Sequence, residues 1–171
     1  GSLVTNKAID EADLLIAVGT RFSDRVALNT ERFAKKAKVV QIDIDLSEIN
    51  KNVMVDAYLT GDVKAILTAL LPLVKSADRS AWIETLETYK KEDYIPQDDP
   101  DRITPHELVR AICAGTDKET VYVTDVGQHQ MWAAQYIHHT GARNFLTSGG
   151  LGTMGYGYGA AIGAQFAFPE K

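Results

Sequence analysis

Five short clusters of glycine, hydroxyl and acidic residues each follow directly after an apolar segment of the chain. They are Gly19-Thr20-Arg21, Asp43-Ile44-Asp45, Gly61-Asp62, Asp125-Val126-Gly127-Gln128-His129 and Ser148-Gly149-Gly150. In open parallel sheets, ligands bind beyond the carboxyl ends of the strands, because helix N-termini and free loop amides gather there. Any single polar loop is equally well explained as a solvated turn. The recurrence of such loops after all five segments favours a ligand-binding crevice.

The Gln128-His129 pair indicates a site for a phosphate group. It begins a predicted helix straight after a strand, where free N–H groups and the helix dipole favour an anion. The other histidines have simpler explanations: His106 belongs to a capping turn, and His138 and His139 are expected on the surface. A zinc site is disfavoured, because the histidines lack ligand spacing beyond one adjacent pair and no cysteine assists. The order of residues contains no Ser-His-Asp arrangement with a nucleophile elbow.

The segment Gly150-Leu151-Gly152-Thr153-Met154-Gly155 literally matches the GxGxxG pattern of dinucleotide sites. A full fingerprint also needs a following strand and an acidic residue about twenty positions on, and the sequence ends at Lys171. Gly155, Gly159 and Gly163 lie four apart, which places them on one helix face where another backbone could approach. We therefore expect packing first, with a ligand contact at the leading glycines. An NAD-binding module remains an alternative.

The elements that would position the first three clusters form an α/β pattern. Residues 14–18 and 38–44 are apolar strands, a helical turn over residues 8–12 precedes them, and residues 28–36 suit a crossover helix, so a parallel sheet is predicted. Asp62 is expected to cap a helix. Its apolar face, predicted to be core, comprises Val63, Ile66, Leu67, Leu70, Leu71 and Val74. Pro72 is expected to weaken or end this helix.

A second α/β pattern follows a linker. Residues 80–94 suit a polar surface helix, and the prolines and aspartates of residues 96–101 exclude regular structure. Thr104-Pro105-His106-Glu107 is a capping box that opens a helix. Strands are then predicted at residues 120–124 and 144–147, and helices at residues 128–138 and 153–168. The predicted division is residues 1–75, a linker with a surface helix at 76–103, and residues 104–171.

Composition narrows the classes of function. The chain has 171 residues, 45% of them hydrophobic, which is enough for a core. The net charge of -5 without clustered Lys and Arg argues against nucleic acid, and no apolar run approaches the roughly 18 residues of a membrane span. The lone Cys113 fits a reducing compartment, so we expect a cytoplasmic protein. Gly1-Ser2, with no methionine, is typical of residues left by an expression tag and indicates a piece of a longer protein.

Several of these motifs resemble the large catalytic subunit of acetolactate (acetohydroxyacid) synthase, a thiamine-diphosphate-dependent family. The segments 125–132, 147–155 and 160–164 resemble the opening of its diphosphate-binding domain, and 18–25 and 41–45 resemble its central, FAD-binding domain. The resemblance covers nearly the whole chain. It implies two partial three-layer units with parallel sheets: the C-terminal half of the flavin domain and the N-terminal half of the thiamine domain. Two departures are Tyr158-Gly159, where the family has Leu-Pro, and Ser23, where it often has aspartate.

The resemblance also implies roles for individual residues. Met154 would be the apolar wedge under a bent thiamine diphosphate, and the Gly152 carbonyl would accept from the aminopyrimidine. The residues implied to flank this cofactor are Val126, Gly127, Gln128 and His129. Those implied to contact FAD are Gly19, Thr20, Arg21, Phe22, Ser23, Asp43, Ile44, Asp62 and Val63. Asp24 and Arg25 match residues beside the substrate channel.

The activity implied by the resemblance is decarboxylation of pyruvate and ligation of the two-carbon unit to a second 2-oxo acid, toward branched-chain amino acids. The whole enzyme would use thiamine diphosphate, Mg²⁺ held by ligands outside this chain, and FAD. It would form a homodimer or tetramer, and a regulatory small subunit is possible. Two alternatives stay open besides the NAD-binding module: another thiamine-dependent 2-oxo acid decarboxylase or oxidase, and a noncatalytic assembly domain.

We expect negligible carboligation by this chain alone. The activating glutamate and the magnesium ligands of the family lie outside it, so no complete catalytic site can be preorganised. Incubating the purified chain with pyruvate, thiamine diphosphate and Mg²⁺ and assaying acetolactate tests this expectation. Steady turnover by the isolated chain would refute it.

Overall fold

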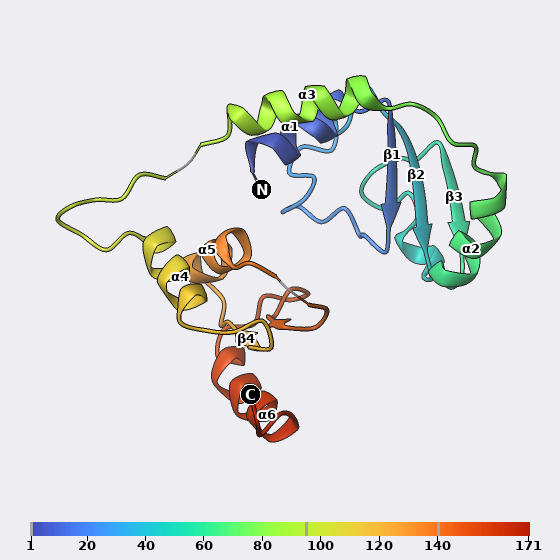
Figure 1. Ribbon diagram of the computed structural model, residues 1–171. Coiled ribbons are helices and arrows are strands. Elements are labelled where there is room, and N and C mark those ends of the chain that lie inside the picture. The colour runs from blue at the N-terminus through green and yellow to red at the C-terminus, as the bar shows by residue number, and fades with distance from the viewer. Residues whose placement is uncertain (1, 95, 140) are drawn as a thin grey trace. The chain divides into compact units, whose positions relative to one another are not determined.

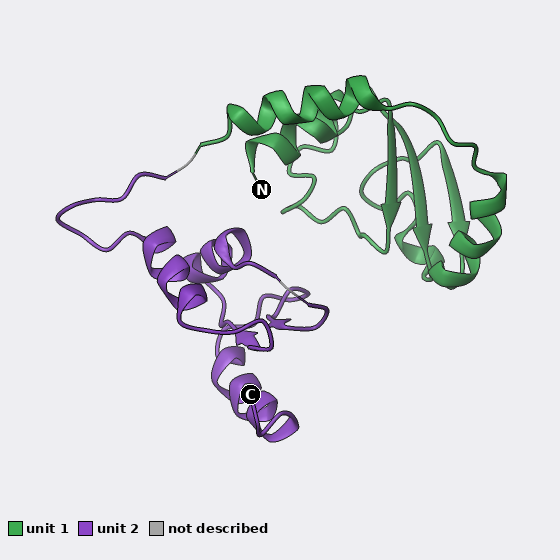
Figure 2. Ribbon diagram, viewed as in Figure 1, with its two compact units in different colours: residues 1–94 green, residues 95–171 purple. Residues whose placement is uncertain are grey.

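The chain folds into two compact units, residues 1–94 and residues 95–171 (Figure 1, Figure 2). The computed structural model describes residues 2–94, 96–139 and 141–171. None of the helices in these ranges combines the length and the apolar composition needed to cross a membrane.

The first unit is built on a three-stranded parallel sheet. Its strands are β1 (Leu14–Val18), β2 (Lys38–Asp43) and β3 (Ala57–Thr60), in the order β1-β2-β3. The arrows of all three run in the same direction in Figure 1, and Val18 pairs with Ile42, which pairs with Leu59. The predicted parallel sheet and its first two strands are therefore confirmed.

Two helices of the first unit lie along each other beside this sheet. They are α1 (Leu3–Glu11), which is longer than the predicted helical turn, and α3 (Ser80–Lys91), the predicted surface helix. Figure 1 shows α3 lying along α1, and the two helices are in contact. Lys7 of α1 pairs with Glu92 and lies 4.8 Å from the ring centroid of Tyr89. This contact holds the end of the first unit back against its beginning.

The connection between β1 and β2 is not the predicted crossover helix. The N–H groups of Arg32 and Phe33 both donate to the Asn29 carbonyl at 3.0 Å, which makes one turn, but Ala34 then has a φ of 47°. A left-handed residue ends a right-handed helix. Phe33 and Ala34 instead turn inward, so the prediction of a helix over residues 28–36 was wrong.

The core of the first unit lies around β1, β2 and the loop between them. The buried apolar side chains that pack together in one cluster are Ala17, Phe22, Ala27, Val39 and Val53. Phe22 and Phe33 pack edge to face with ring centroids 5.6 Å apart. Apolar burial of this kind is the main source of stability of the unit.

The helix α2 (Val63–Leu70) begins where Asp62 predicts it and continues into a 3₁₀ turn, η2 (Leu71–Leu73). The Asp62 carboxylate accepts from the Ala65 N–H at 2.9 Å. The prediction that the apolar stripe is core was wrong: α2 has no buried residue, and Leu71 is 75% exposed. A 3.6-residue period decides which side chains share a face, whereas burial requires a second surface packed against that face.

A buried amide fixes the loop that follows β1. Gln41 in β2 is fully buried, and its Nε2 donates to the carbonyls of Thr20 at 3.1 Å and Glu48 at 3.3 Å. Glu48 closes a second 3₁₀ turn, η1 (Leu46–Glu48). Asn52 adds a bond from its Nδ2 to the Arg21 carbonyl. These bonds determine the course of the backbone beyond the sheet.

In residues 96–139 and 141–171, the second unit has two short parallel strands and three helices. They are α4 (Pro105–Ala114), β4 (Tyr122–Val123), α5 (Gln128–Tyr136), β5 (Phe145–Leu146) and α6 (Tyr156–Ala167). Tyr122 pairs with Phe145 in the β4–β5 ladder. Each predicted element exists, but both strands are shorter than predicted. The helix α6 begins three residues late because Gly155 has a φ of 88°.

The entry to α4 is the predicted capping box. Thr104 Oγ1 accepts from the Glu107 N–H, and the Glu107 carboxylate accepts from the Thr104 N–H at 2.7 Å. His106 is buried, with its Nε2 2.8 Å from Asp98 Oδ1, which holds the preceding segment on this turn. The expected capping-turn role of His106 is therefore confirmed. Residues 96–101 form no helix or strand; residue 99 makes one isolated bridge, with Arg102.

Substituting Gln41→Leu should lower the free energy of unfolding of the first unit by about 1–3 kcal/mol, because two half-buried loop residues lose the donor to their carbonyls. Urea unfolding followed by Trp82 fluorescence in a Trp132→Phe background would measure this. Asn52→Ala removes an exposed bond from the same loop and should cost within about 0.5 kcal/mol. Equal losses for the two variants would contradict the assigned role of Gln41.

Candidate functional site

Three of the predicted clusters meet at the carboxyl edge of the first sheet. The Gly19 N–H donates to the Ile42 carbonyl at 2.8 Å, and the Gly61 N–H donates to the Asp43 carbonyl at 3.0 Å. The cluster after each strand is thus bonded to the end of β2. Gly19 has a φ of 61° and no atom within 4 Å of where a Cβ would stand. The edge therefore presents an open backbone surface, as parallel strands predict.

Side chains at this edge divide into buried and exposed groups. Phe22 is in the core at 3% exposed, so only its backbone can face a ligand, and the Asp62 carboxylate is engaged in capping α2. Thr20, Ser23 and Asp43 are half-buried. Besides Asp62, the exposed predicted residues at this edge are Gly19, Arg21, Ile44 and Val63, together with Asp24 and Arg25 in the turn that follows.

In the second unit, the turn between β4 and α5 offers free amide groups. Gly127 has φ 152° and ψ -165°, and among the described side chains none caps the first turn of α5. The His129 ring lies beside Gly127, since a Cβ on Gly127 would stand 3.2 Å from its Nδ1. Gln128 and His129 are both exposed, whereas Val126 is half-buried. An uncapped N-terminus next to an imidazole can bind an anion such as a phosphate.

The turn between β5 and α6 presents apolar side chains on a constrained backbone. Gly152 has a φ of 65° and Gly155 a φ of 88°. Ser148 Oγ accepts from the Thr153 N–H at 2.9 Å across the turn. Met154 is 79% exposed and Leu151 is 90% exposed. The backbone of the turn is therefore held in place while its Met154 side chain remains available for contact.

Polar side chains connect the ends of β4, α5 and β5. Thr147 Oγ1 accepts from Thr124 Oγ1 at 2.8 Å and from Gln130 Nε2 at 2.8 Å. Thr124 is buried, so its hydroxyl bond to Thr147 ties β4 to the turn that follows β5.

Asp125 joins the two turns and was not assigned a role by sequence reasoning. Its carboxylate accepts from the N–H groups of Val126 at 2.7 Å, Gly157 at 2.8 Å and Gly155 at 3.0 Å. These backbone bonds, that of Val126 first, hold the pKa of Asp125 below its ordinary value. The sequence shows an acidic residue at a strand end and a later glycine-initiated helix, but not the bonds that join them.

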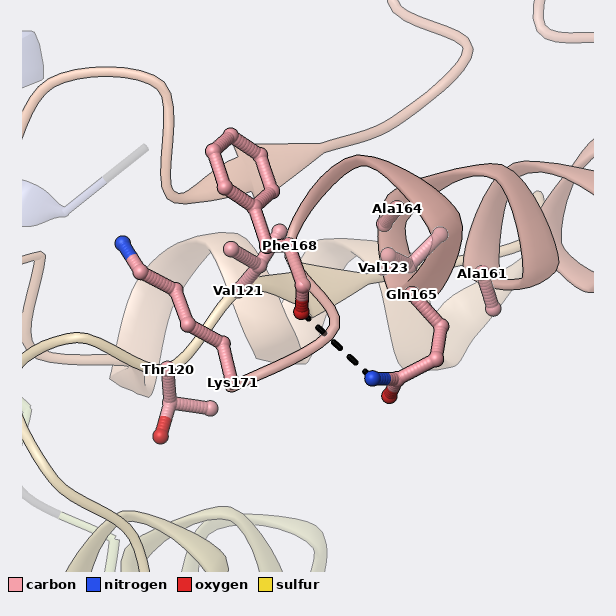
Figure 3. Close-up of a pocket in the computed structure, with 8 residues that line it drawn as sticks. All are labelled: Thr120, Val121, Val123, Ala161, Ala164, Gln165, Phe168 and Lys171. Carbon is pink, nitrogen blue, oxygen red and sulfur yellow. Dashed lines mark hydrogen bonds between the residues drawn. The ribbon is translucent and has the colours of Figure 1, made fainter.

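The predicted site contains no group of metal-binding side chains in the described residues. The cavity shown in Figure 3 lies away from the predicted cofactor residues. Within the described ranges, no three His, Cys, Asp or Glu side chains are grouped so as to hold a metal ion. A cavity of about 380 Å³ lies between β4 and the C-terminal half of α6. Figure 3 shows its lining, which includes Val121, Ala164 and Phe168 and none of the predicted cofactor residues.

Comparison with known families agrees with both units. The sequence pattern described as "Thiamine pyrophosphate enzyme, central domain" matches residues 1–70, and that described as "Thiamine pyrophosphate enzyme, C-terminal TPP binding domain" matches residues 125–171. The chain belongs to the thiamine pyrophosphate enzyme family. The first match lies inside the first unit and the second contains both turns joined by Asp125. The family expected from sequence and its α/β fold class are confirmed.

Individual relatives are acetolactate synthases. The chain is 46% identical to the acetolactate synthase large subunit of Lactococcus lactis, over 100% of this chain and 30% of the relative. It is 43% identical to the mitochondrial acetolactate synthase catalytic subunit of Aspergillus candidus, over 99% of this chain and 27% of the relative. It is 41% identical to the acetolactate synthase isozyme 1 large subunit of Escherichia coli K12, over 98% of this chain and 30% of the relative. The chain thus spans less than a third of the length of these relatives.

The bonds to Asp125 predict a specific acid sensitivity. An aspartate whose folded pKa is below its ordinary 3.8 stabilises the fold fully above that value, and this stabilisation is lost as the pH falls through the folded pKa. Asp125→Asn should therefore lower the Tm near neutral pH and flatten its dependence on pH below about 4. Thermal unfolding between about pH 6 and about pH 2 measures both effects. An Asp125→Asn variant with the acid profile of the unsubstituted chain would contradict the prediction.

The matched control is Asp117→Asn in the turn before β4. The Asp117 carboxylate accepts from the Glu119 N–H and the Thr120 hydroxyl, within its own turn. Because it connects no distant segments, its loss should leave most of the acid profile unchanged.

Proposed function

We propose that the chain is part of an acetolactate synthase, which decarboxylates pyruvate and ligates the two-carbon unit to a second 2-oxo acid. The observation that carries the proposal is the pair of turns joined by Asp125, inside the range matched to the thiamine-binding domain. One turn offers an uncapped helix start and the other an exposed Met154. The names of the relatives supply the reaction class.

The residues present fit thiamine diphosphate. The free N–H groups at the start of α5, with Gln128 and His129, suit the diphosphate, and Val126 and Gly127 border it. Met154 is an exposed apolar side chain of the kind that could support a bent cofactor, and the neighbouring Gly152 would offer its carbonyl to the aminopyrimidine. When bound, the cofactor supplies the carbon that attacks a 2-oxo acid and holds the charge left by decarboxylation. We propose Mg²⁺ on the diphosphate, held by ligands that are not on this chain.

FAD is proposed at the carboxyl edge of the first sheet. Gly19, Thr20, Arg21, Phe22 and Ser23 would contact it largely through the backbone that Gln41 holds in place. Asp43, Ile44, Asp62 and Val63 would complete the contact from the next two strand ends. The open space at Gly19 and the exposed Ile44 support this assignment. Asp24 and Arg25, both exposed, are proposed to border the substrate channel.

The remaining proposals concern the whole enzyme. We propose a cytoplasmic homodimer or tetramer, with a regulatory small subunit as a further partner, and no catalysis by this chain alone. The domain division at residues 1–75, 76–103 and 104–171 also stays a proposal. A flavin-free thiamine-dependent decarboxylase or oxidase is the alternative within the family, and the flavin absorbance of the purified whole enzyme separates the two.

A chimera tests the proposed function directly. The matching segment of the Lactococcus lactis relative is replaced by this chain, which aligns over its whole length. The chimera should bind thiamine diphosphate with Mg²⁺, carry FAD and form acetolactate from pyruvate. A chimera that folds and binds NAD in place of thiamine diphosphate would overturn the proposal.

Within this chimera, Met154→Ser should lower the rate of acetolactate formation or the affinity for thiamine diphosphate by about tenfold to a hundredfold. The reason is the loss of an apolar contact worth about 1.5–3 kcal/mol. Steady-state assays with titrated cofactor measure both quantities. Leu151→Ser, in the same turn and even more exposed, should change neither by more than about twofold. Full activity after both Met154→Ser and Gly152→Val would remove the basis of the assignment.

A further inference from the structure

We propose that Asp125 is a positioning residue that fixes the turn bearing Met154 against the turn that begins α5. The inference rests on the proposed function, because it concerns the distance between the two turns that would bind the two ends of the same cofactor. It adds a residue that is not among those proposed to contact the cofactor.

The evidence is the span of the carboxylate. Oδ1 accepts from the N–H groups of Val126 and Gly155, and Oδ2 accepts from that of Gly157. Gly155 lies 30 residues from Asp125 along the chain and Gly157 lies 32 residues away. A charged acceptor makes stronger hydrogen bonds than a neutral one. One side chain thus links the turn after β4 to the start of α6.

Gly157 makes this approach possible from the other side. It is buried, and a Cβ at this position would stand 2.7 Å from the Asp125 backbone N and 2.9 Å from the Asp125 Cβ. A contact that short with backbone forces a shift. The close approach of α6 to the β4–α5 turn therefore needs both the carboxylate and the missing side chain.

The same carboxylate also makes the starts of α5 and α6 different in their hydrogen bonding. It satisfies N–H groups at the start of α6, whereas no described side chain caps α5. N–H groups that already donate to a carboxylate are not available to a negatively charged ligand, whereas those of an uncapped start are. Asp125 therefore occupies the start of α6, leaves the start of α5 open to a diphosphate beside Gln128 and His129, and fixes the turn that bears Met154.

Two measurements test the inference. In the 171-residue chain, amide exchange at Gly155 and Gly157 should be about tenfold faster in Asp125→Asn and unchanged in Asp117→Asn. In the chimera, Asp125→Asn and Gly157→Ala should each weaken thiamine diphosphate binding about tenfold. The double variant should be no weaker than the worse single one, because both break one contact. A merely stabilising role would lower the Tm without changing the affinity of the folded chimera.

The outcomes separate the two proposals. Unchanged exchange in Asp125→Asn, or faster exchange with unchanged cofactor affinity, overturns the positioning role and leaves the proposed function standing. Additive losses in the double variant also overturn it. An unsubstituted chimera that folds but binds no thiamine diphosphate overturns the proposed function, while the exchange rates still report whether the carboxylate joins the two turns.

Discussion

Parallel strands deliver their loops to one edge of a sheet, but a ladder of two residues per strand cannot hold those loops in register. In the second unit, β4 and β5 are that short. The carboxylate of Asp125 supplies the missing constraint by accepting three backbone N–H groups from two turns. The hydroxyl of Thr147 adds a neutral link between the same strand ends. The geometry of the candidate site depends on these side chains more than on the sheet.

In the first unit, a neutral side chain holds the loops at the sheet edge. Gln41 is fully buried and bonds two loop carbonyls through its amide. A charge at that depth would need a partner that offsets its desolvation, whereas a neutral amide costs less to bury. Both bonds of Gln41 come from its Nε2, and its buried Oε1 has no partner in the described part of the chain. Asp125 is half-buried and can stay ionised because three N–H groups surround it. The choice of residue at each edge thus follows from burial.

The helices α5 and α6 both start beyond the carboxyl ends of β4 and β5, and their first turns differ in side-chain capping. The start of α6 is bonded to Asp125, and the start of α5 carries no side-chain cap. Free N–H groups that a protein leaves open at a strand edge are suited to a ligand phosphate. This difference between the two helix starts lies within the range matched to a thiamine pyrophosphate binding domain. It is the structural basis for proposing that the cofactor's diphosphate binds at α5. The exposed Met154 on the adjacent turn gives the site an apolar side as well.

Local patterns were enough for the family and for most of the elements. The Asp62 cap, the Thr104 capping box and the strands β1 and β2 depend on neighbours within a few residues, and each is where the sequence predicts it. The helix predicted over residues 28–36 failed because Phe33 and Ala34 are drawn into a core, a tertiary demand that overrides propensity. The stripe on α2 is correctly placed on one face, but its burial depended on packing that no period encodes. Only the tertiary structure brought Asp125 to Gly155 and Gly157, because a hydrogen bond across 30 residues of chain leaves no periodic trace in the sequence.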